Sequence, residues 1–218
     1  GKLVPANEYW DFVDNDNDPS EAGTLRVDPA FGHGTHVAGI VAITAPGAKI
    51  MPLRVLDQNG EGELWRITAA IIWAANNGAD IVNLSLGYPE NVRLLKDLFD
   101  CVDVGTTPTG TTFPQIGNNR LAVVAASGNG GNTAMIFPAA EDLNGSIGVG
   151  ASTRIDTLAS FSTYDRAWVE VTAPGEEIVS ALPGNRYGMW TGTSMAAPIA
   201  SILFLNSSLA IRASGDKE

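Results

Sequence analysis

The sequence is poor in three features that often point to a class of protein. It holds a single cysteine, Cys101, so an intramolecular disulfide is impossible and the thiol is predicted to be a small buried hydrophobe. No uninterrupted apolar run reaches the roughly eighteen residues that a membrane-spanning helix needs. Basic residues are scarce, since 13 Lys and Arg stand against 24 Asp and Glu, a formal net charge of -11. The sequence therefore predicts neither a nucleic-acid partner nor a membrane partner.

The residues that are present are typical of a globular domain. Hydrophobic residues make up 44% of the chain and charged residues 17%, which excludes wholesale disorder. The chain opens with Gly-Lys-Leu-Val-Pro, without an initiator Met or a basic-then-apolar leader. No targeting segment can be read from it, and we expect a fragment or a processed product.

Apolar runs separated by Gly and Pro predict strands that alternate with helices. Strands are expected at Ile50 to Leu56 and Asp80 to Leu86, on either side of a helix from Leu64 to Asn77. A second unit pairs a helix at Val92 to Phe99 with a fully covered strand at Leu121 to Ser127. Because crossovers between parallel strands are right-handed, the helices should cover both faces of one sheet. We predict an α/β fold in one domain, with further strands at Ser146 to Ala151, Val169 to Thr172 and Ile178 to Ala181 and a last helix from about Ser194 to Leu209.

The two histidines of the chain, His33 and His36, lie in the segment Phe-Gly-His-Gly-Thr-His-Val-Ala-Gly-Ile. Gly32 and Gly34 leave room for another backbone or a substrate to approach His33, for which a functional and a structural role both remain open. His36 starts an apolar face and is predicted to be a core histidine. A zinc site is disfavoured, because the spacing lacks the His-Glu-x-x-His pattern and no third nitrogen or sulfur ligand is nearby.

Two further segments carry polar side chains where elements are expected to begin or end. In Thr191-Gly-Thr-Ser-Met-Ala-Ala-Pro, Ser194 should stand at a helix amino terminus, where backbone N–H groups favour an anion formed beside its oxygen. The alternative is a helix cap without a catalytic role. In Ala126-Ser-Gly-Asn-Gly-Gly, Asn129 follows a buried strand and can point an amide at a reacting carbonyl, unless it only forms an Asn-Gly turn.

A hydroxyl nucleophile, an imidazole base and an amide donor together form the set that acyl transfer needs. The order of these residues narrows the choice of fold. An α/β-hydrolase would need its histidine after the serine and a Gly-x-Ser-x-Gly elbow, and neither occurs here. A chymotrypsin-like enzyme is built from β-barrels, which the alternating helices contradict. The subtilisin order, with the histidine before the serine on an α/β fold, remains.

These segments resemble the motifs of the subtilisin-like serine peptidases, the subtilases. His33-Gly-Thr-His-Val-Ala-Gly is similar to the histidine motif of that family, and Gly192-Thr-Ser-Met-Ala-Ala-Pro is similar to its serine motif. The resemblance covers about residues 10 to 204, and further landmarks match in the same order at Asn83-Leu-Ser-Leu-Gly, Ala126-Ser-Gly-Asn129, Ile147-Gly-Val-Gly-Ala and Ala173-Pro-Gly. It implies a subtilisin-like three-layer fold, with a mainly parallel central sheet and helices on both faces.

The resemblance also implies a serine endopeptidase that cleaves polypeptides through an acyl-enzyme and needs no cofactor for the chemistry. It makes His33 the general base, Ser194 the nucleophile and Asn129 the oxyanion donor. The edge that pairs with an extended substrate would be formed by Ser85, Leu86 and Gly87. The first specificity pocket, whose small residues would admit a large apolar or aromatic side chain, would be lined by Ala126, Ser127 and Gly128. We also expect a monomer, and an extracellular location as the family's usual habit.

The opening segment Trp10-Asp-Phe-Val-Asp-Asn-Asp-Asn-Asp is rich in carboxylates. It resembles the calcium-holding loop of thermitase-like subtilases, and calcium binds several carboxylate and carbonyl oxygens in flexible geometry. An acidic solvated turn is the alternative interpretation. The candidate ligands of a structural Ca²⁺ are Asp11, Asp14, Asp16 and Asp18.

The chain departs from the family pattern at both ends. The family's catalytic aspartate lies in an Asp-Ser/Thr-Gly motif well before the histidine, and no aspartate before His33 is followed by either pair; the missing strand would lie upstream of Gly1. Pro198 is followed by Ile-Ala-Ser where the family usually has His-Val-Ala-Gly. We therefore expect a single partial catalytic domain over residues 1–218, truncated at its amino and carboxyl ends. Its peptidase activity should be very weak or absent, since losing the aspartate costs subtilisin about 10⁴-fold in kcat.

Two interpretations from other classes stay open. A non-catalytic subtilase-like module could hold a peptide along Ser85 to Gly87 without cleaving it. The second interpretation is a structural α/β domain that carries these motifs by chance.

Overall fold

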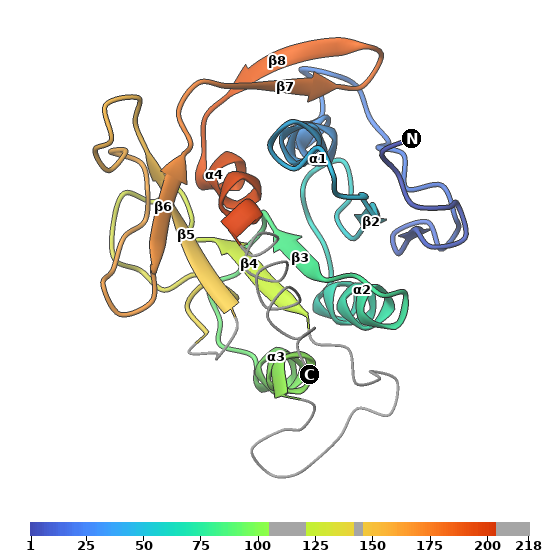
Figure 1. The fold of residues 1–218 in the computed structure, drawn as a ribbon, viewed down its shortest axis with the longest axis horizontal. Helices are drawn as coiled ribbons and strands as arrows, with labels where there is room; N and C mark the ends of the chain where they lie inside the picture. The colour runs from blue at the N-terminus through green and yellow to red at the C-terminus, as the bar shows by residue number, and fades with distance from the viewer. Residues whose placement is uncertain (105–120, 142–145, 204–218) are drawn as a thin grey trace, which may run out of the picture.

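The computed structural model describes residues 1–104, 121–141 and 146–203 of the chain (Figure 1). Its main sheet has four parallel strands in the order β3-β4-β5-β6. A short parallel pair, β1-β2, and an antiparallel hairpin, β7-β8, lie apart from this sheet. The strands are β1 (Trp10–Asp11), β2 (Leu53–Arg54), β3 (Ile81–Leu84), β4 (Ala122–Ala126), β5 (Ser146–Ser152), β6 (Val171–Pro174), β7 (Ile178–Leu182) and β8 (Arg186–Trp190).

Helices cover both faces of the main sheet, as the sequence predicts (Figure 1). One side carries α4 (Thr193–Ala200), with α1 (His33–Thr44) packed against it, and the other carries α2 (Leu64–Asn76) and α3 (Arg93–Val104). The result is the predicted three-layer α/β arrangement with a parallel central sheet.

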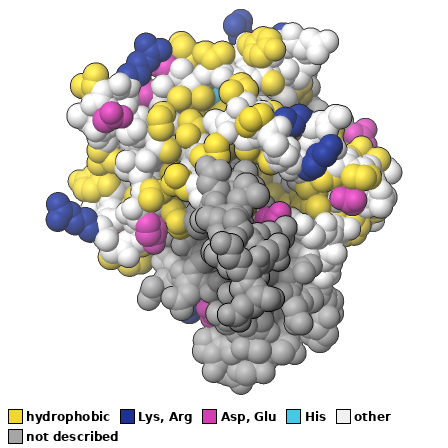
Figure 2. Space-filling view, viewed as in Figure 1, with side chains coloured by type: hydrophobic (Ala, Val, Ile, Leu, Met, Phe, Trp, Pro, Cys, Tyr) yellow, Lys and Arg dark blue, Asp and Glu magenta, His cyan; other side chains and the backbone are white. Residues whose placement is uncertain are grey.

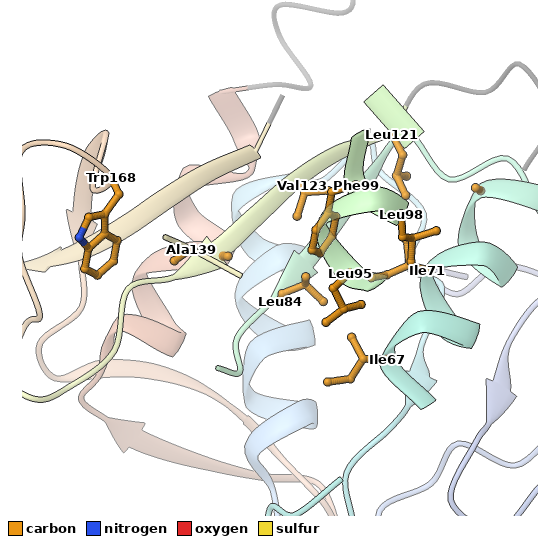
Figure 3. Close-up of a cluster of buried hydrophobic side chains, with 12 residues drawn as sticks. Ile67, Ile71, Leu84, Leu95, Leu98, Phe99, Leu121, Val123, Ala139 and Trp168 are labelled. Atoms are coloured by element: carbon orange, nitrogen blue, oxygen red, sulfur yellow. The ribbon is translucent and has the colours of Figure 1, made fainter. Parts of the chain in front are cut away.

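The alternation of side chains along β4 explains why both faces need cover. Val123 and Ala125 belong to a core cluster with residues of α2 and α3, whereas Val124 and Ala126 belong to a second cluster with α4. Successive side chains of a strand point to opposite faces, so a strand that is apolar at every position needs a layer on each side. The first cluster is drawn in Figure 3 and is centred on Ile67, Ile71, Leu84, Leu95, Leu98, Phe99, Leu121 and Val123.

A cavity of about 1180 Å³ separates the β1-β2 pair from the main sheet. It is bounded by β2 on one side and by β3 on the other, and side chains of α1 and α2 complete its walls. Within the described residues, β2 pairs only with β1 and β3 pairs only with β4, so the second edge of each strand has no partner strand. The predicted single sheet is therefore interrupted at this point in the described residues.

Most predicted elements are present, with shifted ends. The predicted helix at Leu64 to Asn77 is α2, and the predicted strand at Leu121 to Ser127 is β4. The strand expected at Ile50 to Leu56 shrinks to β2. The hairpin strand β8 was not predicted, because its Arg-Tyr-Gly-Met-Trp sequence lacks an apolar run. The predicted last helix is described only as far as residue 203, and the side chain of Cys101 lies outside the described residues.

No helix in the described part of the chain is long and apolar enough to cross a membrane. On the face shown in Figure 2, the Lys and Arg side chains lie scattered in small separate groups among hydrophobic side chains. The described part of this face therefore offers no continuous basic surface.

Candidate active site

Ser194 is the second residue of α4, at the amino terminus predicted from its sequence. Two hydrogen bonds join it to Ser85, which follows β3: the Ser85 hydroxyl donates to the Ser194 carbonyl at 2.7 Å, and the Ser194 hydroxyl donates to the Ser85 carbonyl at 3.4 Å. The second bond is long and weak. The candidate nucleophile therefore lies directly beside the predicted substrate edge, with its hydroxyl only loosely held.

Asn129 is held next to Ser194 by hydrogen bonds to Thr193, the residue that precedes Ser194. Its Oδ1 accepts the Thr193 backbone N–H at 2.8 Å and the Thr193 hydroxyl at 3.0 Å. The Thr193 hydroxyl oxygen in turn accepts the Gly128 N–H at 3.1 Å. Both bonds use the carbonyl end of the Asn129 amide, and its Nδ2 donates no hydrogen bond within the described residues. A free amide donor beside a serine hydroxyl is the arrangement that an oxyanion needs.

His33 is the first residue of α1, and Trp190 at the end of β8 lies beside it, with ring centroids 6.1 Å apart. Burial lowers the pKa of His33 below its ordinary value, and the carboxylate of Glu21 partly opposes this shift. A lowered pKa keeps the imidazole neutral near pH 7, which is the form that a general base requires. No aspartate hydrogen-bonds to His33 in the part of the chain that the structure describes.

Glu21 was not predicted from the sequence. Its carboxylate accepts the backbone N–H groups of Gly32 and Thr35 and the Thr35 hydroxyl, the two Thr35 bonds being 2.6 Å long. These donors belong to the first turn of α1, which has no partner of its own for them. Glu21 thus caps the amino terminus of α1, where His33 lies. Nothing in the local sequence marks this role, since the glutamate stands outside the helix and outside any capping pattern.

A cavity of about 690 Å³ joins the base to the predicted substrate edge. His33 and Trp190 line one part of it, and Ser85, Leu86 and Gly87 line another. The structure therefore brings together the predicted general base and all three predicted edge residues. Contacts of Ser194 with Ser85 and of Asn129 with Thr193 bring the candidate nucleophile and the candidate oxyanion donor close to this edge.

The three residues predicted to line the specificity pocket differ in their surroundings. Ala126 is buried in the core cluster against α4, and the buried Ser127 hydroxyl donates to the Thr163 carbonyl at 3.0 Å. Gly128 is partly exposed and has a positive φ of 101°, a conformation that favours glycine. Ile136, which was not predicted, lies against it.

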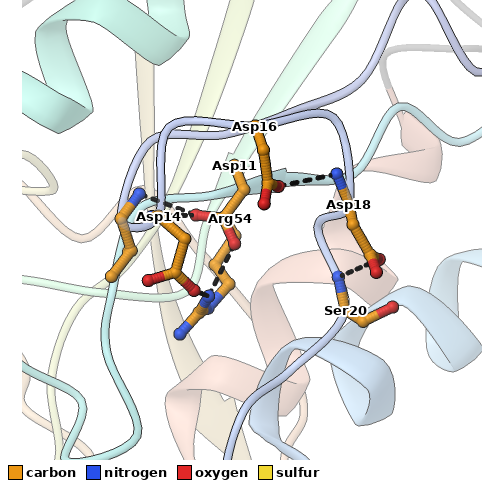
Figure 4. A network of polar contacts seen from close by, with 7 residues as sticks. Asp11, Asp14, Asp16, Asp18, Ser20 and Arg54 are labelled. Atoms are coloured by element: carbon orange, nitrogen blue, oxygen red, sulfur yellow. Dashed lines mark hydrogen bonds and ion pairs between the residues drawn. The ribbon is translucent and has the colours of Figure 1, made fainter.

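The carboxylates of the acidic loop are paired with an arginine side chain from β2. Arg54 Nη1 donates to Asp11 Oδ2 and to Asp14 Oδ2, both at 2.6 Å (Figure 4). Asp16 and Asp18 accept backbone N–H groups within the loop instead, from Asp18 and Ser20. No group of three or more His, Cys, Asp or Glu side chains among the described residues is placed to hold a metal ion. As they stand, these carboxylates do not form a calcium site.

His36 is fully buried, as its apolar neighbours predict. Its ring stacks on Trp190 at 4.9 Å between centroids, and Nε2 lies 3.2 Å from the Gly188 carbonyl. One tryptophan therefore contacts both histidines and ties β8 to α1.

Comparisons with known proteins agree with this geometry. Residues 4–205 match the profile of the Subtilase family. A thermophilic serine proteinase from Bacillus sp. (strain AK1) is 42% identical over 208 residues, which cover 91% of this chain and 45% of that protein. Thermitase from Thermoactinomyces vulgaris is 38% identical over 208 residues, covering 91% of this chain and 64% of thermitase.

The fold has a counterpart among solved structures as well. A cold adapted subtilisin-like serine proteinase matches with a TM-score of 0.73 at 29% sequence identity, over 95% of this chain and 69% of that one. The chain spans 45% and 64% of the length of the two relatives named above. With the family match extending over residues 4–205 and the motif residues assembled in one place, this chain belongs to the Subtilase family.

Proposed function

We propose that the chain carries the base, the nucleophile and the oxyanion donor of a serine endopeptidase that hydrolyses peptide bonds in proteins. The observation that carries this proposal is the link from Asn129 through Thr193 to Ser194, beside the edge residue Ser85. It supports a site in which a serine hydroxyl, an amide and a strand-like edge act together.

In the first step, the Ser194 oxygen attacks the scissile carbonyl carbon as His33 takes the hydroxyl proton. The carbonyl oxygen becomes an oxyanion, which the Asn129 Nδ2 group stabilises. His33 then gives its proton to the leaving amine as the carbon–nitrogen bond breaks, which leaves an acyl-enzyme on Ser194.

In the second step, water attacks the acyl carbon and His33 accepts its proton. The bond to Ser194 breaks, the proton returns to the serine oxygen, and a carboxylic acid is released. No cofactor takes part in either step. The substrate is a polypeptide in extended conformation that pairs with Ser85 to Gly87.

Labelling with a fluorophosphonate probe tests this function. An activated serine forms an oxygen–phosphorus bond and expels fluoride, whereas an ordinary serine hardly reacts. We expect labelling of the chain, none in the Ser194→Ala variant, and unchanged labelling in Ser160→Ala, which removes an exposed serine elsewhere. Equal labelling of the chain and Ser194→Ala would refute the assignment of the nucleophile.

Turnover by this chain on its own should be very weak. In the described residues, Glu21 is the carboxylate that affects the pKa of His33. No aspartate there accepts a hydrogen bond from the imidazole. Loss of that aspartate costs a subtilisin about 10⁴-fold in kcat. A peptide-anilide assay measures this, and turnover of several per second that Ser194→Ala abolishes would contradict it. The cavity between β2 and β3 supports the idea that a further strand belongs beside these two edges.

Peptide binding without cleavage is the second candidate function. It is favoured by the hydrogen bond of the Ser194 hydroxyl, which goes to the Ser85 carbonyl rather than to His33. Peptide affinity without fluorophosphonate labelling would support it.

Calcium at the acidic loop, a monomeric state and an extracellular location remain predictions of the sequence. Calcium binding would require Arg54 to release Asp14, because the two are ion-paired at 2.6 Å. Isothermal titration with CaCl₂ tests this, and the absence of any heat up to millimolar concentration would overturn it. Analytical ultracentrifugation tests the monomer.

A further inference from the structure

Ile136 fills the space between two glycines of the candidate active site. A Cβ added to Gly87 would overlap with Cγ2 of Ile136, and a Cβ added to Gly128 would lie 3.0 Å from its Cγ1. The first distance is shorter than two carbon atoms tolerate, and the second is tighter than most Cβ contacts. One isoleucine side chain therefore touches both glycine faces at once.

Under the proposed peptidase function, Gly87 and Gly128 flank the position of the attacked residue's side chain. Gly87 ends the substrate edge that begins at Ser85, and Gly128 immediately precedes Asn129. A peptide that pairs with the edge and presents its carbonyl oxygen to Asn129 must direct the side chain of the attacked residue into the gap between them. Ile136 already occupies the inner part of that gap.

Hydrogen bonds hold each side of the gap in place. Phe137, the next residue after Ile136, exchanges two backbone hydrogen bonds with Tyr88, both 2.8 Å long. The Gly128 carbonyl accepts the Thr163 N–H at 2.8 Å. These bonds fix the backbone on both sides, so the Ile136 backbone cannot shift away from the glycines without breaking hydrogen bonds that contribute about 1 kcal/mol each.

We propose that Ile136 is the residue that sets the specificity of this site, by restricting the attacked position to short side chains such as Gly, Ala and Ser. This rests on the proposed peptidase function and replaces the expectation of a large apolar or aromatic side chain. That expectation considered only the small residues Ala126, Ser127 and Gly128. Ile136 is a larger side chain that a different segment contributes.

Two peptidyl diphenyl phosphonates that differ only in the residue beside phosphorus, an alanine or a phenylalanine analogue, test the proposal. Each reacts by forming a bond between phosphorus and the Ser194 oxygen as phenoxide leaves. We expect the chain to react at least about tenfold faster with the alanine probe. In Ile136→Gly the phenylalanine probe should gain about tenfold or more while the alanine probe changes little.

Met135→Ala is the matched control, because Met135 is the neighbouring hydrophobic residue and is 58% exposed. Its ratio of the two rates should equal that of the unmodified chain. If Ile136→Gly does not fold, Ile136→Ala takes its place, with folding checked by a cooperative thermal transition. A phenylalanine probe that reacts as fast as the alanine probe, or an unchanged ratio in the folded variant, would overturn the proposal.

Failure of the peptidase function is distinguishable from failure of the specificity. If neither phosphonate nor the fluorophosphonate labels the chain, the peptidase function fails. The preference is then measured as the Kd of matching alanine and phenylalanine peptides for the Ser194→Ala variant. Tighter binding of the alanine peptide supports the restriction by Ile136, and equal binding overturns it.

Discussion

The carboxylate of Glu21 accepts both the backbone N–H and the side-chain hydroxyl of Thr35, each at 2.6 Å. Thr35 is two residues after His33 on the first turn of α1, so this contact fixes the end of the helix that carries the candidate base. The negative charge of Glu21 lies close enough to His33 to raise its pKa against the effect of burial.

Replacing Glu21 with glutamine should therefore lower the pKa of His33 further. The chain has two histidines, so two imidazole signals in an NMR pH titration report both pKa values, and His33→Asn assigns them. The pKa of His36 serves as an internal control, because Glu21 is not among the groups that shift it. A rise in the pKa of His33 would contradict the electrostatic role of Glu21. Because the amide NH2 replaces one of the two acceptor oxygens, part of the cap is lost and the free energy of unfolding should fall by about 1 kcal/mol.

Removing the amide of Asn129 should slow the reaction of Ser194 with the fluorophosphonate by about 10²- to 10³-fold, the size found for one oxyanion donor in a subtilisin. The variant is Asn129→Leu, and the measurement is the second-order rate constant of labelling. Asn132→Leu is the control, since Asn132 is exposed in the same loop and, among the described residues, its side chain accepts a hydrogen bond from the Ala134 N–H alone. Equal rates in the two variants would remove Asn129 from the oxyanion site.

Replacing Arg54 with methionine should destabilise the protein by about 3 kcal/mol, because it leaves the buried carboxylate of Asp11 without its cation. The side chains of this pair are 9% and 1% exposed. Asp14→Asn breaks the other ion pair of Arg54, in which Asp14 is 57% exposed, and should cost less than about 1 kcal/mol. Urea unfolding curves measure both variants, and equal losses would show that burial does not govern this network.

The lowered pKa of His33 makes stability depend on pH with a definite sign. Between the folded pKa and the unfolded value of about 6.5, the unfolded chain binds more protons than the folded one. The contribution of His33 is therefore complete above about pH 6.5 and is lost as the pH falls through its folded pKa. Subtracting the urea midpoints of His33→Asn from those of the unmodified chain isolates it. A difference that grows toward acid pH in favour of the unmodified chain would contradict the direction of the shift.

Some features of the fold and the site follow from local sequence, and others do not. Apolar periodicity identified α2 and β4, and Ser194 was predicted at a helix amino terminus, where the structure has it. These features depend on neighbours within a few positions of the chain. They could be read without knowing the tertiary fold.

Other features depend on contacts between distant segments. Glu21 reaches α1 across a loop, and Arg54 crosses from β2 to satisfy the acidic loop that the sequence predicted as a calcium site. Trp190 packs on both histidines from the hairpin, and its own strand had no apolar pattern to predict it. None of these side chains lies within a recognisable motif.

The sequence by itself thus determined the α/β class, the family resemblance and the three residues proposed for the chemistry. Local periodicity and short motifs encode those properties. Only the tertiary structure decided what surrounds these residues: the carboxylate beside His33, the cation in the acidic loop and the isoleucine between Gly87 and Gly128. Such contacts depend on how separate segments pack, and packing places side chains together without leaving a local pattern in the chain.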